Sequence, residues 1–140
     1  MKKIFYVLVS LVIFTSCNSD ERRPTDATSD SDIDAARNFI QAALVGDYHR
    51  ARTFMINDSL NLGHLNAIER LNERMSPLEK ERYQTASIRI HEKTKINDST
   101  SIVQFSNSYK NKIDSLKVIR ANGKWLVDFK FLFKKNDTLP

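Results

Sequence analysis

Near its end the chain reads ANGKWLVDFKFLF (Ala121–Phe133), and this stretch decides the fold. Asn122-Gly123 is the strongest short-range signal for a β-hairpin, because both residues readily take the positive φ angles of a type I′ turn. Apolar residues then alternate without a gap along one side: Trp125, Val127, Phe129, Phe131 and Phe133. This alternation predicts an antiparallel strand with one face on a core, over which Trp125 packs, and the other mostly in water.

The same period of two extends upstream to about Ala86. Three further strands are predicted at about residues 88–96, 103–109 and 116–118, and Tyr109 falls on the apolar face of the second. Asn97-Asp98-Ser99 is typical of a turn between the first two strands. Together with the last hairpin, these runs predict a four-stranded meander.

The residues before the strands follow a helical period of about 3.6. Helices are predicted over about residues 33–44, 48–55 and 60–75, with a further turn from Ser76. Ser31-Asp32-Ile33-Asp34 and Ser76-Pro77-Leu78-Glu79 have the spacing of capping boxes, Gly46 ends the first helix, and Asp47 can cap the second. Helices first and strands afterwards predict an α+β domain, with the N-terminal helices packed on one face of a curved antiparallel sheet.

The first residues predict export rather than a fold. Met1-Lys2-Lys3 precedes an apolar run over Ile4–Phe14, whose eleven residues would span about 16 Å as a helix against about 30 Å for a bilayer core. Phe14-Thr15-Ser16-Cys17 resembles a lipobox, although Phe14 departs from the usual aliphatic residue. We therefore expect residues 1–16 to be a lipoprotein signal peptide, cleaved between Ser16 and Cys17, with acyl chains such as palmitate on Cys17 as the membrane anchor. The alternative is an ordinary signal peptide followed by a free cysteine.

Residues 17–31 are expected to form an acidic flexible tether, because their composition cannot bury a core. Ser19-Asp20-Glu21 within it resembles the export signal of Bacteroidota-type lipoproteins. That resemblance implies the outer membrane, with the domain displayed at the cell surface. The α+β domain then occupies residues 32–140.

Charge is unevenly distributed along the chain, whose formal net charge is +5. Residues 17–34 carry six acidic and two basic side chains, and residues 35–140 carry 18 basic and 11 acidic ones. A basic domain could favour an anionic partner, and the alternative is a solvated surface of mixed charge. Because no Lys/Arg run with interleaved aromatic residues occurs, we expect no nucleic-acid partner.

Two segments together resemble the nuclear-transport-factor-2-like superfamily. One is Ala35–Phe39 followed by Gly46-Asp47-Tyr48, and the other is Asn122–Val127. More narrowly, the chain is similar to small uncharacterised lipoproteins with a lumazine-binding-like domain of that class. The resemblance covers about residues 32–134 and implies a cone, in which a curved sheet wraps around helices and leaves a pocket at the open end. The superfamily includes ketosteroid isomerase and dehydratases, and many members without known activity.

Four residues are candidates for such a pocket: Tyr48, Tyr83, Glu92 and Tyr109. Glu92 shares the strand parity of Ile88 and Ile90, so it either points inward as an acid or lies in water beyond the helices. The tyrosines either line a pocket mouth or bury their rings with the hydroxyl at the rim.

No catalytic constellation or phosphate-binding loop stands out in the sequence. The histidines His49, His64 and His91 form no i, i+4 pair, so no metal site and no cofactor are expected. We expect His64 in the core or at its rim and His91 in water.

The leading hypothesis is a lipid-anchored lipoprotein whose domain binds a small ligand or an envelope protein without catalysis. The alternatives are an isomerase- or dehydratase-like enzyme with Glu92 or a histidine as base, and an accessory structural subunit of an envelope complex.

Overall fold

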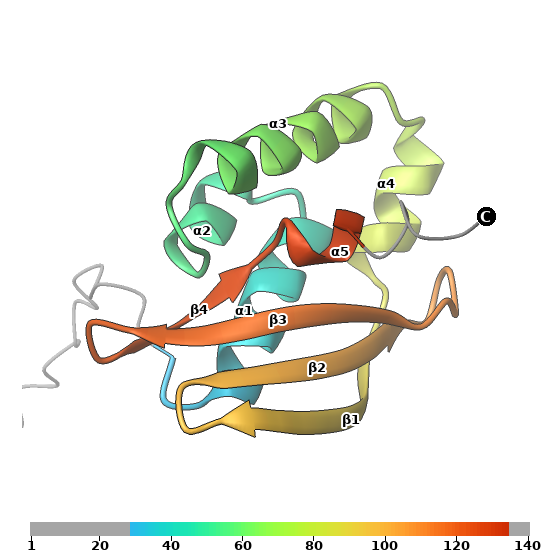
Figure 1. The fold of residues 1–140 in the computed structure, drawn as a ribbon. Coiled ribbons are helices and arrows are strands. Elements are labelled where there is room, and N and C mark those ends of the chain that lie inside the picture. Colours follow the sequence, from blue (N-terminus) through green and yellow to red (C-terminus); the bar gives the residue numbers. More distant parts are fainter. Residues whose placement is uncertain (1–28, 135–140) are drawn as a thin grey trace, which may run out of the picture.

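Helices come first in the fold and an antiparallel sheet follows (Figure 1). The computed structural model describes residues 29–134. Within them the elements are α1 (Asp32–Leu44), α2 (Tyr48–Thr53), α3 (Ser59–Glu73), α4 (Pro77–Gln84), β1 (Ile88–Asn97), β2 (Thr100–Asn107), β3 (Asp114–Ala121), β4 (Lys124–Asp128) and α5 (Phe131–Lys134). The strands are hydrogen-bonded in the order β1-β2-β3-β4. The predicted α+β class and the four-stranded meander are confirmed.

Each of the first four helices begins at a side chain that caps it. The cap residues Ser31, Asp47, Asp58 and Ser76 each accept a hydrogen bond from the backbone N–H three residues later. At Ser76 the capping box is complete, because Glu79 also accepts the Ser76 backbone N–H, at 3.2 Å. These caps satisfy donors that a helix start otherwise leaves open, and three of the four were predicted.

The hairpin between β3 and β4 has the predicted turn. Asn122 and Gly123 have φ angles of 51° and 77°, as a type I′ turn requires. The turn between β1 and β2 falls at Asp98-Ser99, also as predicted.

The last strand is shorter than the alternation predicted. Strand β4 ends at Asp128 after five residues, and residues 131–134 form α5. The backbone N–H of Lys130 donates to Oδ1 of Asn61 on α3 at 2.8 Å, and that of Leu132 donates to the carbonyl oxygen of Phe129 at 3.1 Å. Because these bonds replace ladder bonds to β3, the predicted strand over Phe131–Phe133 is wrong.

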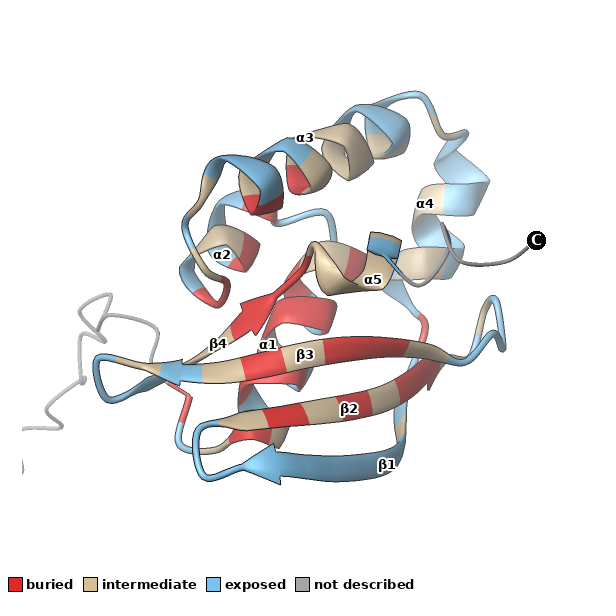
Figure 2. Cartoon of the chain, in the orientation of Figure 1, coloured by how far each residue is buried: buried red, intermediate tan, exposed pale blue. Residues whose placement is uncertain are grey.

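The core lies between α1 and the concave side of the sheet. Ala35 and Ala36 on α1 are fully buried, and so are Val103 on β2, Val118 on β3 and Val127 on β4. Figure 2 shows this buried side on α1, β2, β3 and β4, whereas β1 is largely exposed. Only α1 covers the sheet broadly; α2 packs on α1, and α3 packs on α2.

Trp125 is half-buried rather than enclosed. It packs against the edge of the core, and the guanidinium of Arg120 lies 5.9 Å from its ring centroid. Its neighbours on the same side, Val127 and Phe129, are buried. The predicted register of this strand up to Phe129 is therefore right, and Trp125 packs on the core as expected, but at its edge and only half-buried.

The outer edge of β4 is covered. Met55 forms a parallel bridge to Val127, with Ile56 N–H donating to the Val127 carbonyl at 2.9 Å and Val127 N–H to the Phe54 carbonyl at 2.8 Å. Within residues 29–134 no strand pairs with the outer edge of β1.

Candidate functional site

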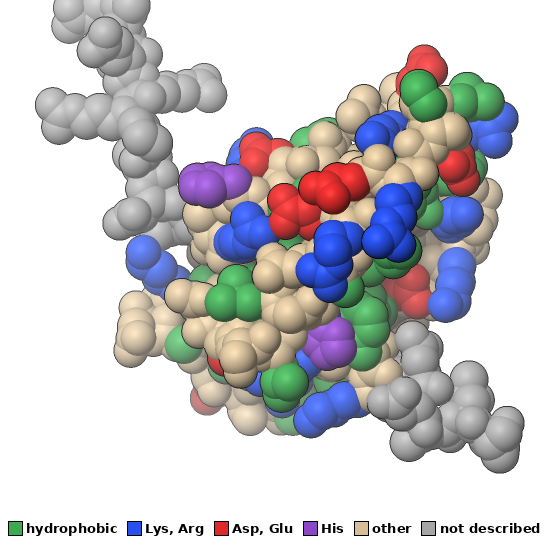
Figure 3. Space-filling view, turned by 90° about the horizontal axis from the view of Figure 1, so that it is seen from above, with side chains coloured by type: hydrophobic (Ala, Val, Ile, Leu, Met, Phe, Trp, Pro, Cys, Tyr) green, Lys and Arg blue, Asp and Glu red, His purple; other side chains and the backbone are tan. Residues whose placement is uncertain are grey.

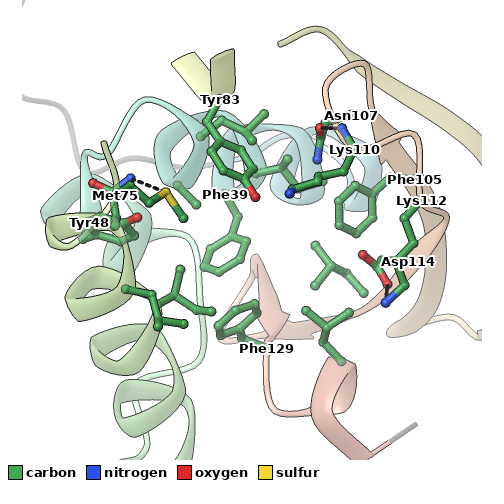
Figure 4. Close-up of a pocket in the computed structure, with 18 residues that line it drawn as sticks. Phe39, Tyr48, Met75, Tyr83, Phe105, Asn107, Lys110, Lys112, Asp114 and Phe129 are labelled. Atoms are coloured by element: carbon green, nitrogen blue, oxygen red, sulfur yellow. Dashed lines mark hydrogen bonds and ion pairs between the residues drawn. The ribbon is translucent and has the colours of Figure 1, made fainter. Parts of the chain in front are cut away.

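A cavity of about 580 Å³ lies between α1, α3, α5 and one end of the sheet (Figure 4). It exists because α3 rests on α2 rather than on the sheet, so that α3 and the strands form opposite walls. Its volume falls within the range of roughly 300–1,000 Å³ that is typical of small-molecule sites.

The walls of the cavity are apolar over most of their surface. Helix α1 contributes Phe39, Ile40, Ala43 and Leu44, and α3 contributes Ile68 and Leu71. The other apolar lining residues are Met75 after α3, Phe105 and Leu116 of the sheet, Phe129 after β4, and Leu132 of α5. Leu71 remains 53% exposed. The interior can therefore take an apolar molecule, and part of its wall is open to water.

Polar groups gather at one end of the cavity. In Figure 4 the Tyr83 hydroxyl, the Asn107 amide and the Lys110 side chain extend over it from α4 and from the end of β2 and the loop that follows. Lys110 Nζ lies 4.9 Å from the Tyr109 ring centroid and 5.8 Å from that of Tyr83. We call Tyr83, Asn107 and Lys110 the donor wall.

A charged pair lies on the sheet side of the same end. Lys112 Nζ is 3.6 Å from an Asp114 carboxylate oxygen. Among the described residues that line the cavity, Asp114 is the one carboxylate, and no histidine lines it. The cavity therefore lacks an acid–base pair inside its apolar part.

Tyr48 lines the cavity with a buried ring, which is 6% exposed. Burial, and to a smaller extent the nearby Glu69 carboxylate and Tyr83, together raise the pKa of its hydroxyl to about 12. The phenol therefore stays neutral at physiological pH and is a poor proton donor to any base.

Two of the four predicted pocket residues, Tyr48 and Tyr83, line the cavity. Tyr109 does not line it, because β2 ends at Asn107 and the chain turns before Tyr109. Its ring instead packs edge-on against Tyr83, at 4.8 Å between centroids. Tyr109 thus supports the pocket from behind, and its predicted place in the pocket is wrong.

Glu92 is exposed and is not one of the residues that line the cavity. The ladder pairs Ile90 with Phe105 and Glu92 with Gln104, so a bulge at His91 shifts the parity of β1. Glu92 therefore points away from the core, in agreement with the solvated alternative. Lys93 takes the inward position instead.

Lys93 reaches a buried carboxylate that the sequence analysis missed. Its Nζ lies 3.3 Å from Asp32, at the start of α1, and Asp32 also accepts the Ser101 hydroxyl. Burial alone raises the pKa of the Asp32 carboxyl, but the hydrogen bonds from Ser101, Lys93 and the Ile33 N–H outweigh it and lower the pKa. This cluster ties α1 to β1 and β2, and no sequence pattern indicated it because the bulge hides the parity.

The histidines form no site in the described part of the chain. His64 on α3 stacks on Phe133 of α5, with centroids 4.0 Å apart and planes 7° apart, which confirms a place at the rim of the core. His91 is exposed and bonds to the Ser106 hydroxyl at 2.8 Å. Across residues 29–134 no group of three or more Cys, His, Asp or Glu residues could hold a metal ion.

The surface seen from above carries both signs of charge. Figure 3 shows blue Lys and Arg side chains interspersed with red Asp and Glu side chains on this face. Acidic and basic side chains also pair directly in the domain, as the half-exposed Arg52 and Glu69 do at 2.6 Å. This face therefore agrees with a solvated surface of mixed charge.

The predicted cleavage and lipidation residues, Ser16 and Cys17, and the predicted export signal, Ser19-Asp20-Glu21, lie outside the described residues. Among residues 29–134 no helix is long and apolar enough to span a bilayer. Comparisons with protein-family models, curated proteins and solved structures find no match to this chain.

Proposed function

We propose that this chain is a lipid-anchored lipoprotein of the cell envelope, whose domain binds an apolar small ligand without transforming it. One observation carries the second half of this proposal: a cavity of about 580 Å³ has apolar walls and polar groups at one end only. Such a lining recognises a ligand mainly by excluding water from its apolar surface.

The same lining argues against the isomerase-like alternative. Proton abstraction beside a carbonyl needs a carboxylate or histidine base inside an apolar pocket, with an acidic donor near it. Asp114 lies at the rim and is paired with Lys112, Tyr48 has a raised pKa, and Glu92 is exposed. Binding is therefore the better use of this site.

We further assign the domain to the nuclear-transport-factor-2-like class as a proposal. Its support is the combined occurrence of the Gly46-Asp47-Tyr48 segment, the Asn122-Gly123 hairpin, and a cavity between helices and a sheet. The anchor is proposed on the residues before and at Cys17, which have the order of a lipoprotein signal.

A neutral fluorescent probe, N-phenyl-1-naphthylamine, tests for the binding site. Every residue of the core cluster lies between Ala35 and Phe133, so a soluble form that begins at Asn18 retains all of them. Adding this soluble form to the probe should raise the probe fluorescence. Ala43→Phe places a large ring into the cavity from its wall and should abolish that rise, whereas Gln41→Phe on the exposed side of α1 should retain it. No rise with the unaltered domain, or equal rises with both variants, would contradict the proposal.

Metabolic labelling with palmitate tests the anchor. Cys17→Ala should abolish incorporation of label and block processing at the lipoprotein site, because the thiol is the acceptor of the lipid. Ser16→Ala, which keeps a small residue before the cysteine, is the control and should remain labelled. Equal labelling of the Cys17→Ala chain would overturn the lipoprotein assignment.

Protease shaving of intact cells tests surface display. Replacing Asp20 and Glu21 by Asn and Gln removes the charges of the candidate export signal, so the lipidated chain should become inaccessible to protease. Asp26→Asn, in the same acidic segment, is the matched control. Unchanged accessibility after the Asp20 and Glu21 changes would remove this signal from the proposal.

A further inference from the structure

We infer that the ligand is an amphiphile with a carboxylate at one end, and that the donor wall of Tyr83, Asn107 and Lys110 holds this carboxylate. The inference rests on the proposed function, because it names the ligand class of the same cavity. It comes from the distribution of donors and acceptors around the cavity mouth.

Three kinds of hydrogen-bond donor converge at the donor wall. Asn107 Oδ1 accepts the backbone N–H groups of Tyr109 at 3.1 Å and Lys110 at 2.9 Å. Its oxygen is therefore committed to the loop, and its NH₂ group faces the cavity (Figure 4). The Tyr83 hydroxyl and the Lys110 ammonium extend over the same space (Figure 4).

The position of Lys110 is held by aromatic rings rather than by an acid. Its ammonium lies over the Tyr83 and Tyr109 rings, which are themselves packed edge-on against each other. Within residues 29–134 it forms no ion pair. The Glu79 carboxylate on α4 is near enough to interact electrostatically with Lys110 and with Arg82, but among the described residues no carboxylate forms an ion pair with the Lys110 ammonium.

The charges at this end do not cancel. Lys112 is paired with Asp114. Glu79 interacts electrostatically with both Lys110 and Arg82, and the Arg82 guanidinium lies over the Tyr109 ring. Three cations against two carboxylates leave one net positive charge at the donor wall.

A carboxylate presents two acceptor oxygens and one negative charge, so it can accept from the phenol, the amide and the ammonium together. An alcohol offers no charge, and an amphiphilic cation is repelled. The apolar remainder of the same ligand then fills the space between Phe39, Leu71 and Phe129.

Competition against N-phenyl-1-naphthylamine tests this inference on the soluble form beginning at Asn18. The competitors share one chain length and differ in the head: dodecanoate, dodecanol and dodecyltrimethylammonium, each below its micelle concentration at pH 8. Dodecanoate should compete about tenfold or more better than dodecanol, since a hydrogen bond to a charged group contributes roughly that factor. Dodecyltrimethylammonium should be the weakest competitor.

Variants assign the preference to the donor wall. The quantity compared is the ratio of dodecanoate affinity to dodecanol affinity. Lys110→Met keeps an apolar stem and should reduce this ratio to about one, whereas Lys110→Arg should retain most of it. Tyr83→Phe should lower the ratio. Lys117→Met makes the same charge change on the opposite face of β3 and should leave the ratio unchanged. Thermal melts confirm that each variant is folded.

The outcomes separate the two proposals. Equal competition by dodecanoate and dodecanol, or a ratio unaltered in Lys110→Met, would overturn the carboxylate site while leaving an apolar binding cavity. Binding of neither the probe nor any competitor would overturn both.

Discussion

Replacing Asn61 with Ala should loosen the whole junction between α3, β4 and α5. Asn61 is 0% exposed. Its Oδ1 accepts the Lys130 backbone N–H at 2.8 Å, and its Nδ2 donates to Asp58 at 3.0 Å and to Asp128 at 3.4 Å. The substitution removes all three side-chain bonds. The Asp128 carboxylate is buried, whereas the Asp58 side chain is 35% exposed and can bond to water instead.

The magnitude follows from those partners. An unsatisfied buried polar group costs about 1–3 kcal/mol. The Lys130 N–H loses its acceptor outright, whereas Asp58 and Asp128 each keep a contact with Lys130 Nζ, at 2.6 and 3.4 Å. We therefore expect a loss of about 2–4 kcal/mol in the free energy of unfolding, against a total of about 5–15 kcal/mol for a domain of this kind.

Asn66→Ala is the matched control on the same helix. Asn66 is half-buried and accepts one bond from Arg52, at 2.9 Å, and Arg52 also keeps its pair with Glu69. Its loss should cost less than about 1 kcal/mol. Urea unfolding followed by fluorescence of the single tryptophan and by circular dichroism gives both values. If the two variants differ by less than about 0.5 kcal/mol, the Asn61 bonds do not hold β4 and α5 in place.

Three further results are expected. Leu116→Ala should lower the free energy of unfolding by about 2–5 kcal/mol, because Leu116 is buried. Trp125→Ala should lower it by only about 1–2 kcal/mol, because the ring is half-buried. A larger loss for Trp125→Ala than for Leu116→Ala would contradict the core described above. The pKa of Tyr48 is raised from 10.0 to about 12, so the unfolded chain loses this proton first and stability should fall as pH rises through that window. In denaturant titrations at several pH values, Tyr48→Phe should lose less stability than the unaltered chain over this window. An equal loss in both proteins would show that Tyr48 is not the cause. The pKa of the Asp32 carboxyl is lowered from 3.8, so the stability that Asp32 contributes should be present above pH 4 and disappear as pH falls through the lowered value. Ser101→Ala removes the hydroxyl that donates to this carboxylate and should raise the pH midpoint of acid unfolding. An unmoved midpoint would contradict the role of the Ser101–Asp32 hydrogen bond.

Local signals in the sequence were sufficient for most of the fold. Ser76 and Glu79 carry a capping box in four residues, and Asn122-Gly123 carries a turn in two, so both could be predicted without knowledge of the tertiary structure. The end of β4 could not be predicted in this way. Phe129 and Phe133 are four residues apart, a spacing that fits both a strand and a helical turn, and their ring centroids lie 5.2 Å apart across the turn into α5. Asn61, which is distant in sequence, decides between strand and helix by accepting the Lys130 N–H.

The candidate site was predictable only in part for a similar reason. Tyr48 follows a helix cap, and its place in the cavity agrees with the local pattern. Glu92 and Tyr109 were misplaced because a bulge and an early strand end shift residues between faces, which apolar periodicity does not reveal. Lys110 lies in a loop with no periodicity, so only its position beside Tyr83 and the cavity identifies it.

The bulge at His91 also has a consequence for self-association. Strand β1 is the open edge of the sheet, and an exposed edge offers backbone donors and acceptors to a strand from another copy. Such an addition requires an unbroken ladder, but β1 changes register after Ile90 and again after Lys95. Beyond the first break the strand also carries the exposed Lys95, and a charged side chain on an edge strand disfavours pairing with another strand. The irregularity that turns Glu92 away from the core therefore also protects the domain against edge-to-edge aggregation.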